Sequence, residues 1–342
     1  MADVIADPEL DPAATYAVDP ARARALTARV VASGDEPDMR TTTPLTGAPL
    51  ATLPVSSARD VVKAVALARA AQGSWVATSL RERAEILLRL HDLVLDHQPE
   101  LLDLVQLESG KARGHAFEEV ADCAIVARHY ARRGPAMLAD TRHPGAFPLL
   151  SQAVEHRRPK GVVGIVSPWN YPLSLAVSDA IPALLAGNAV VLRPDPQGSL
   201  TALAAVELFA QAGLPDGVLQ VVLGPGDPTG QAVVDHTDYV SFTGSTATGR
   251  RVAEAPGDAW WGCRWSWAAR TPCTSPPTRT CAGPSTGPCG PASARPGSCA
   301  SAPNGSSSTP TSTTSSCPAS WSGSPRCGSR RACTGAPTWA AW

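Results

Sequence analysis

The residue types available to the chain change abruptly at Ala259. From Ala259 to Trp342 the sequence contains no Val, Ile, Leu, Met, Phe or Tyr, and no Lys, Asp, Glu or His. Ordering one residue costs about 1–2 kcal/mol of backbone entropy, and a segment built mainly from small residues, Arg, Pro and Trp has little apolar surface to bury in return. We therefore expect residues 259–342 to be a disordered tail, and residues 41–258 to hold the folded domain.

The charge of the chain divides at the same point. Residues 1–258 hold 22 Lys and Arg against 30 Asp and Glu, a net charge of −8, whereas the tail adds seven Arg and no acid. An acidic folded part offers no basic patch for a nucleic acid. The N-terminus, Met1 to Asp7, lacks the basic and apolar regions of a secretory signal. We expect a cytoplasmic protein that binds neither nucleic acids nor membranes.

The cysteines are concentrated in the tail. Eight of the nine lie there: Cys263, Cys273, Cys281, Cys289, Cys299, Cys317, Cys327 and Cys333. Such a density ordinarily suggests a disulfide framework or a zinc site. We expect neither, because no CxxC pair or histidine accompanies these cysteines, and nothing directs the chain to an oxidising compartment. No metal site is predicted.

The tail is interpreted as an out-of-frame translation that begins near Asp258. Every tail residue except Asn304 is encoded by codons with G or C in the middle position. In a GC-rich gene these bases concentrate at the third codon position, and a slip of one nucleotide moves that position to the middle. Trp has the single codon TGG, which fixes neighbouring bases. Read one base back, residues 265–272 permit Leu-Glu-Leu-Gly-Gly-Lys-Asn-Pro, and residues 295–302 permit Ser-Ala-Gly-Gln-Leu-Cys-Ile-Ser.

The remaining sequence predicts an α/β fold. Residues 1–40 show no clear periodicity and are interpreted as a loose N-terminal extension. Apolar residues recur at helical spacing over 61–75, 81–97, 99–108 and about 117–133, which predicts an N-terminal helical layer. Apolar, mostly β-branched runs then alternate with helical segments: Val162–Ser167, Ala189–Arg193, Val218–Leu223 and Tyr239–Thr243, with helices at 173–186, 199–212, 228–234 and 246–255. This alternation predicts a doubly wound parallel sheet, which binds ligands at the carboxyl ends of its strands.

The loop after the first of these strands carries a candidate catalytic amide. It reads Ser167-Pro168-Trp169-Asn170-Tyr171-Pro172. A side-chain amide on a rigid turn can donate to a developing oxyanion, a contribution of about 3–4 kcal/mol in well-studied cases. The same spacing also suits a helix N-cap followed by Pro172 in the first turn, and the local sequence leaves both alternatives open.

The loop after the last predicted strand carries a candidate phosphate site. Glycine and hydroxyl residues from Phe242 to Gly249 open the helix at 246–255, and N–H groups at a helix N-terminus suit a phosphate. A plain helix cap would have the same sequence. The glycines of Leu223–Gly230 lack the GxGxxG spacing and indicate less by themselves.

Taken together, three sequence motifs of the chain resemble those of the aldehyde dehydrogenase superfamily. Residues 161–172 read Gly-Val-Val-Gly-Ile-Val-Ser-Pro-Trp-Asn-Tyr-Pro, residues 182–194 read Pro-Ala-Leu-Leu-Ala-Gly-Asn-Ala-Val-Val-Leu-Arg-Pro, and residues 242–245 read Phe-Thr-Gly-Ser. The resemblance is greatest to the succinate-semialdehyde dehydrogenases of actinobacterial type and covers residues 40–258. It implies a Rossmann-like nucleotide-binding domain and oxidation of a small-molecule aldehyde with NAD(P)+.

The resemblance also implies roles for particular residues. Asn170 matches the family's oxyanion amide. The positions that match its cofactor-binding segments are Ser167, Pro168, Trp169, Arg193, Asp195, Gly226, Gly230, Phe242, Thr243, Gly244 and Ser245. The family's general base is the Glu of Leu-Glu-Leu-Gly-Gly-Lys, and its nucleophile is the Cys of Gly-Gln-x-Cys, which forms a thiohemiacetal. In the decoded reading frame the Glu stands at the position of Ser266 and the Cys at the position of Ala300, 34 residues apart as in the family. Cys299 is a product of the shifted frame.

Two departures from the family concern the cofactor. Arg193 stands where the family usually has a ribose-binding Lys, which keeps the charge but replaces a point charge by a planar fork. NAD-preferring members tend to have a Glu three residues further on, where this chain has Pro196. Without that carboxylate a 2′-phosphate is not repelled. We therefore expect NADP as the cofactor, with NAD as the alternative.

Three hypotheses follow. The first is an NADP-type aldehyde dehydrogenase whose nucleophile and general base are lost to the out-of-frame tail, so that this chain is inactive. The second is a non-catalytic nucleotide-binding or partner-binding module, and the third is an active enzyme with a tail cysteine as nucleophile. The family forms homo-oligomers, but we expect neither the oligomer nor appreciable cofactor binding here, because C-terminal elements complete the family's fold and interface.

Overall fold

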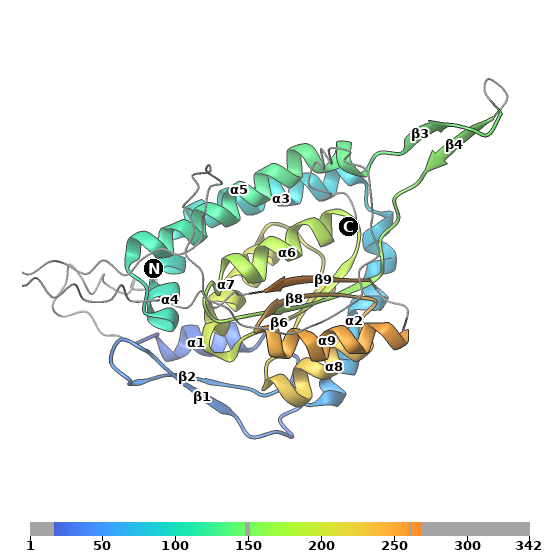
Figure 1. The fold of residues 1–342 in the computed structure, drawn as a ribbon. Coiled ribbons are helices and arrows are strands. Elements are labelled where there is room, and N and C mark those ends of the chain that lie inside the picture. The colour runs from blue at the N-terminus through green and yellow to red at the C-terminus, as the bar shows by residue number, and fades with distance from the viewer. Residues whose placement is uncertain (1–16, 148–150, 260–261, 268–342) are drawn as a thin grey trace, which may run out of the picture. The chain divides into compact units, whose positions relative to one another are not determined.

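A five-stranded parallel sheet forms the centre of the described structure (Figure 1). The computed structural model describes residues 17–147, 151–259 and 262–267, with the backbone alone for 254–259 and 262–267. The strand order is β7-β6-β5-β8-β9. The strands are β5 (Val162–Ser167), β6 (Ala189–Pro194), β7 (Leu219–Val221), β8 (Tyr239–Gly244) and β9 (Gly262–Trp267).

The chain reverses its direction of travel across the sheet at β5. From β5 it steps to β6 and β7 on one side, and then returns to β8 on the other side. Val166 lies opposite Arg193 on β6 and opposite Phe242 on β8, so the three strands end level with one another. The predicted doubly wound parallel sheet is confirmed, and its switch point lies between β5 and β8.

Helices cover both faces of the sheet, as parallel sheets require. One face carries α6 (Ser174–Leu185) and α7 (Ser199–Gln211), and the other carries α2 (Ala58–Ala77), α8 (Gln231–His236) and α9 (Thr246–Ala259) (Figure 1). The outer layer over α6 and α7 consists of α3 (Leu80–Asp96), α4 (Gln98–Ser109) and α5 (Arg113–Leu138). This is the predicted N-terminal helical layer.

Local sequence signals explain where these helices begin and end. Capping boxes start α2 at Ser57 and α3 at Ser79. The side chain of each serine accepts a hydrogen bond from the backbone N–H three residues later, and the acidic side chain at that position accepts one from the backbone N–H of the serine. Gly110 ends α4 in the left-handed region, at φ +70°. The turn η2 (Gly226–Gly230), in which Asp227 has extended φ and ψ angles of −113° and 128°, precedes α8. The helix predicted over 228–234 therefore starts later than expected, at Gln231.

One glycine allows α8 to approach the sheet closely. A Cβ at Gly164 on β5 would lie 2.6 Å from Thr237 Oγ1 and 2.8 Å from Val233 Cγ1. Real Cβ atoms essentially never come that close to another atom. Gly164 thus sets the position of α8, whose N-terminal end borders the edge where β5 and β8 end.

Two buried glutamates join the outer helical layer to the helices below it. Glu119 on α5 accepts from the N–H groups of Leu173 and Ser174, at 3.0 and 3.1 Å, at the start of α6. Glu108 on α4 accepts from Leu200 and Thr201 at the start of α7. Each carboxylate satisfies N–H groups that a helix cannot satisfy internally.

The expectation of a loose N-terminal extension is wrong for residues 17–40. This stretch contains α1 (Pro20–Thr27), whose Leu26 is fully buried, and Val31 donates to the carbonyl of Val221 at 2.9 Å. The helix is too short to show periodicity, but Asp19 caps it, with Pro20 in the first turn, which is a recognisable start signal. Residues 1–16 lie outside the described part.

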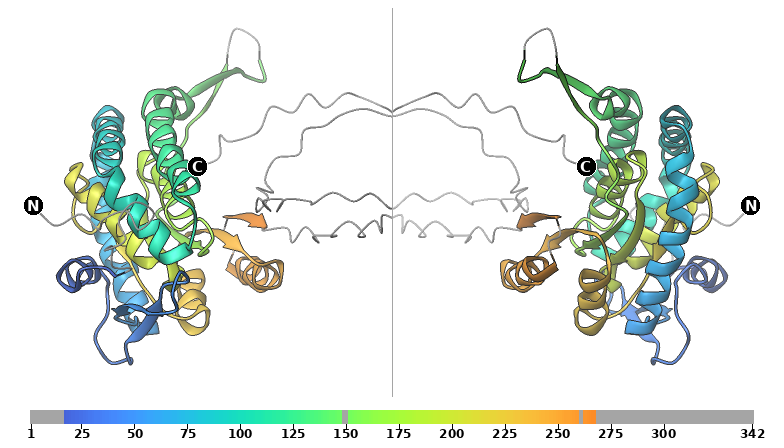
Figure 2. Two further views of the ribbon diagram at one scale, coloured as in Figure 1. Left: turned by 90° about the vertical axis from the view of Figure 1, so that its left-hand side faces the viewer. Right: turned by 90° about the vertical axis from the view of Figure 1, so that its right-hand side faces the viewer.

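Two antiparallel hairpins were not predicted from the sequence. The first pairs β1 (Met39–Thr42) with β2 (Pro49–Leu53), and the second pairs β3 (Thr141–Pro144) with β4 (Gln152–Glu155). All residues of β4 are exposed, and Figure 2 shows this hairpin extending away from the helices. Short strands without an alternating apolar pattern give no periodic signal.

The structure also corrects the predicted start of the disordered tail. Helix α9 continues to Ala259, and residues 262–267 form β9, which pairs in parallel with β8. Strand pairing uses backbone groups, so it does not require the aliphatic side chains that this segment lacks. Residues 260–261 and 268–342, to which most of the expected disorder refers, lie outside the described residues. Among the described helices, none combines the length and hydropathy that crossing a bilayer requires.

Candidate functional site

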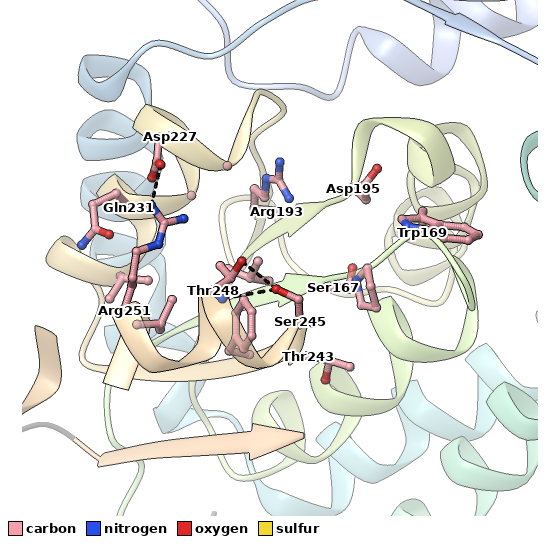
Figure 3. A pocket seen from close by; sticks show the side chains of 18 residues that line it. Ser167, Trp169, Arg193, Asp195, Asp227, Gln231, Thr243, Ser245, Thr248 and Arg251 are labelled. Carbon is pink, nitrogen blue, oxygen red and sulfur yellow. Dashed lines mark hydrogen bonds and ion pairs between the residues drawn. The ribbon is translucent and has the colours of Figure 1, made fainter. Parts of the chain in front are cut away.

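A cavity of about 300 Å³ lies where β5, β6 and β8 end (Figure 3). This volume is at the lower end of those typical of small-ligand sites, roughly 300–1,000 Å³. The predicted cofactor-binding residues all line it: Ser167, Pro168, Trp169, Arg193, Asp195, Gly226, Gly230, Phe242, Thr243, Gly244 and Ser245. Positions that are far apart in the sequence are therefore brought together at the switch point of the sheet. Their role in cofactor binding stays a prediction.

Two buried polar groups in the cavity have unused hydrogen-bonding capacity. Ser167 is 2% exposed, and its Oγ has no hydrogen-bond partner. Arg193 is 7% exposed, donates from Nη2 to the carbonyl of Gly224 at 2.6 Å, and has an unpartnered Nε. Burial lowers the pKa of Arg193, and the charge of Asp195 acts in the opposite direction. A buried polar group without a partner is unfavourable, so both groups fit a polar ligand.

Two glycines leave the cavity open on the side of η2. A Cβ built on Gly226 or Gly230 meets no atom within 4 Å, so a side chain there would extend into empty space. Both residues line the cavity. Their lack of a side chain therefore lets a ligand approach the backbone of η2 and the start of α8.

The N-terminus of α9 opens into the same cavity. Ser245 Oγ accepts from the N–H of Thr248 at 3.2 Å and lies 3.0 Å from its Oγ1. The cap that the sequence left as an alternative is therefore present. It does not exclude an anion site, because a cap satisfies one N–H and the first turn of α9 has others.

Asn170 does not line this cavity, although its neighbour Trp169 does. The side chain is half-buried, and its Oδ1 has no partner among the described residues. The alternative that Asn170 caps α6 is wrong: the helix begins after Leu173, and Glu119 accepts from its first N–H groups. The oxyanion role of Asn170 remains a prediction.

Four further polar residues line the cavity and were not predicted from the sequence. Asp227 and Gln231 come from η2 and α8, and Thr248 and Arg251 come from α9. Arg251 Nη1 donates to Asp227 Oδ2 at 2.9 Å, which links the two segments (Figure 3). For the two residues of α9 the signal available was helical spacing, since positions 248, 251 and 252 lie three and four residues apart and share one face of the helix. The other lining residues are Val166, Val234 and Val252.

This arrangement suits an anionic, polar ligand with an extended shape. The cavity combines two guanidinium groups, a helix N-terminus, unpaired polar atoms and glycine-lined walls, and Trp169 adds an aromatic surface that is 56% exposed. Among the described residues that line it there is no Cys, His or Glu. The described residues contain no cluster of His, Cys, Asp and Glu that could hold a metal.

Comparison with known proteins gives the same family as the sequence motifs. The model of the "Aldehyde dehydrogenase family" matches residues 30–261. A Mycolicibacterium smegmatis protein named "Putative succinate-semialdehyde dehydrogenase [NADP(+)]" is 48% identical over 248 residues, which are 71% of this chain and 47% of that protein. A Mycobacterium tuberculosis H37Rv protein of the same name, numbered 2, is 48% identical over 212 residues, covering 62% of this chain and 41% of that protein.

Solved structures of the family share this fold. The NADP-dependent glyceraldehyde-3-phosphate dehydrogenase of Bacillus halodurans, complexed with NADP, has a TM-score of 0.65 and 31% identity, covering 70% of this chain and 52% of that one. An NAD-dependent benzaldehyde dehydrogenase from Corynebacterium glutamicum gives the same values. This chain spans about half the length of the curated relatives it matches. With a family match across most of its folded part, the chain belongs to the aldehyde dehydrogenase family.

Proposed function

We propose that this chain is the nucleotide-binding half of an NADP-dependent aldehyde dehydrogenase, and that it binds the dinucleotide without oxidising an aldehyde. One observation carries the proposal: the cofactor-binding residues predicted from the sequence line a single cavity at the switch point of the sheet. All of the described residues that line it lie between 166 and 252, upstream of the altered composition. This favours the nucleotide-binding module over our expectation of weak cofactor binding.

The unused polar groups of the cavity define how it would hold the cofactor. Ser167 Oγ and Arg193 Nε offer hydrogen bonds to ribose hydroxyls, and the first turn of α9 offers N–H groups to the pyrophosphate. In the family the bound nicotinamide accepts a hydride from the substrate. We prefer NADP to NAD because Pro196 presents no carboxylate to a 2′-phosphate, and because related proteins are named as NADP-dependent enzymes.

The proposed substrate of the intact enzyme is succinate semialdehyde, after the names of the relatives. We propose that the present chain is inactive because its tail is read out of frame and its general base and nucleophile are replaced. One feature supports this: Cys123 on α5, the one cysteine whose surroundings the structure describes, is fully buried, and burial raises its thiol pKa well above the ordinary value. A buried thiol of this kind is not a nucleophile.

Calorimetric titration and an activity assay test both parts of the proposal. The purified full chain should bind NADP+ in the micromolar range and should reduce no NADP+ with succinate semialdehyde above a no-enzyme control. Absence of binding would overturn the proposal that the chain binds a dinucleotide. Turnover above the control would show that inactivity is wrong and would favour a tail cysteine as nucleophile.

The DNA around codon 258 tests the out-of-frame proposal separately. Restoring one base there should open a reading frame that encodes Leu-Glu-Leu-Gly-Gly-Lys and, 34 residues later, the Cys of Gly-Gln-x-Cys. The repaired protein should oxidise succinate semialdehyde with NADP+. If no single-base change near this codon gives such a frame, the tail is native sequence and this part of the proposal fails.

A further inference from the structure

We propose that the acidic N-terminal segment of the chain, residues 1–16, binds in a groove between α1 and the β1–β2 hairpin. The groove has a volume of about 360 Å³. Helix α1 lies beside this hairpin, and residues of both line the groove (Figure 1). The described residues that line it include none that line the dinucleotide cavity, so this inference is independent of the proposed function.

The groove combines apolar side chains with two positive charges. Val18 and Leu50, which line it, are 5% and 7% exposed and present an apolar surface. Arg24 on α1 and Arg40 on β1 also line it, and both are exposed. No acidic residue is among the described residues of the lining. The groove therefore suits a ligand that carries both carboxylates and apolar side chains.

The two arginines of the groove differ from their neighbour Arg22 in having no acidic partner. Arg22 Nε lies 2.6 Å from Glu100 Oε1. No ion pair or side-chain hydrogen bond joins Arg24 or Arg40 to another described residue. Like charges that share a groove repel each other, and an anion bound between them offsets this repulsion. Both guanidinium groups are therefore available to carboxylates.

The N-terminal segment has the matching composition. It carries no basic side chain and four acidic ones: Asp3, Asp7, Glu9 and Asp11. Val4, Ile5 and Leu10 add apolar side chains. The segment thus offers carboxylates to the two arginines and apolar side chains to the surface formed by Val18 and Leu50.

The segment also reaches the groove without a long connection. It is followed directly by Ala17 and by Val18, which lines the groove. Helix α1 has eight residues and is about 12 Å long, whereas an extended chain spans about 3.3 Å per residue. Sixteen residues are therefore enough to follow the groove along the whole of α1.

Covalent attachment favours this segment over an acidic peptide from another protein. Exposed ion pairs are individually weak. A segment joined to the groove by a short connection has an effective concentration in the millimolar range, which compensates for weak contacts. A separate peptide of the same composition lacks this advantage.

Amide hydrogen exchange of the full chain, followed by mass spectrometry of the peptic fragment that covers residues 1–16, tests the inference. In the wild-type chain these amides should exchange at least about fivefold more slowly than in the free synthetic peptide of the same sequence. Arg24→Gln/Arg40→Gln should bring the rates to within about twofold of the free peptide. Salt at about 0.5 M should do the same, because it screens exposed charges.

A matched control removes two other exposed arginines. Arg59→Gln/Arg250→Gln takes the same charge from α2 and α9, outside the groove lining, and should keep the slow exchange. Asp7→Asn/Asp11→Asn, compared with its own free peptide, should lose it. This second variant leaves the arginines in place, so it tests the pairing even if the double arginine variant folds poorly. Far-UV circular dichroism checks that each variant is folded.

Three results would overturn the inference. The first is exchange of the wild-type segment at the rate of the free peptide. The second is slow exchange that persists in Arg24→Gln/Arg40→Gln, because the segment would then bind elsewhere. The third is slow exchange that disappears on dilution of the wild-type chain, because the groove would then hold the segment of a second copy.

Discussion

The carboxylate of Glu108 accepts a hydrogen bond from the backbone N–H of Thr201 at 2.8 Å, and the N–H of Leu200 donates to its other oxygen at 2.8 Å. Glu108 is 1% exposed. Burial raises the pKa of Glu108 to about 7, and the hydrogen bonds from Thr201 and Leu200 act in the opposite direction. A carboxyl group at the junction of α4 and α7 thus titrates near neutral pH.

We expect Glu108 to make the stability of the protein depend on pH. Its folded-state pKa of about 7 lies above its ordinary value of 4.5, so its contribution is complete below pH 4.5 and is lost as the pH rises through 7. The difference in unfolding free energy between wild type and Glu108→Gln should fall by up to about 3 kcal/mol over this range. Urea denaturation at several pH values measures it. The exposed control Glu118→Gln should keep the wild-type profile, and a flat difference for Glu108→Gln would contradict the assignment.

Replacing Glu119 by Ala should destabilise the fold strongly. The substitution leaves two N–H groups at the start of α6 without an acceptor and removes the ion-pair partner of Lys111. We expect a loss of about 3 kcal/mol in unfolding free energy, since breaking a buried pair leaves an uncompensated charge. Glu118→Ala, one residue away and 63% exposed, is the matched control and should change stability by less than about 1 kcal/mol. Similar losses in the two variants would argue against the capping role.

A side chain at Gly230 should block nucleotide binding without disturbing the fold. The backbone at Gly230 is helical, a Cβ there meets no atom within 4 Å, and Gly230 lines the cavity, so we expect the side chain of Gly230→Val to extend into the cavity. The affinity for NADP+ should fall by about tenfold or more. Gly114→Val is the control, because Gly114 has equally open surroundings on α5, away from the cavity. Equal affinities in the two variants would mean that the dinucleotide binds elsewhere.

The ion pair between Arg69 and Asp238 should respond unequally to loss of its two members. Arg69 donates to both oxygens of Asp238, at 2.8 and 2.9 Å, and Asp238 also accepts from the N–H of Val162 at the start of β5. Arg69 is 51% exposed, so Arg69→Ala should cost about 1 kcal/mol or less. Asp238→Ala should cost about 2–3 kcal/mol, because it also leaves a strand N–H unsatisfied. Chemical denaturation of both variants measures the two losses of unfolding free energy, and a larger loss for Arg69→Ala would contradict the prediction.

Periodicity in the sequence was sufficient to predict the central sheet and most helices. The strand predicted at Val162–Ser167 has those bounds in the structure, and α2 to α5 lie where apolar residues recur at helical spacing. The site was predictable because it is assembled from loops at strand ends. Once the sheet is known to be parallel and doubly wound, Ser167, Arg193 and Thr243 must lie at one edge.

Contacts between residues distant in sequence were not predictable in the same way. Glu119 caps a helix that begins 55 residues later, and nothing near Glu119 in the sequence indicates this partner. The pair between Asp227 and Arg251 likewise depends on how α9 packs beside α8. Elements such as α1 and the strand β9 were missed because short segments held by capping or backbone pairing carry little apolar periodicity.

The described residues that line the cavity at the switch point all come from one continuous stretch of chain, residues 166–252. Selection for holding a nucleotide can therefore act on this stretch regardless of what selection demands of the residues beyond it. The same continuity makes the stretch, with the helices that support it, a natural starting point for grafting a dinucleotide site onto another protein.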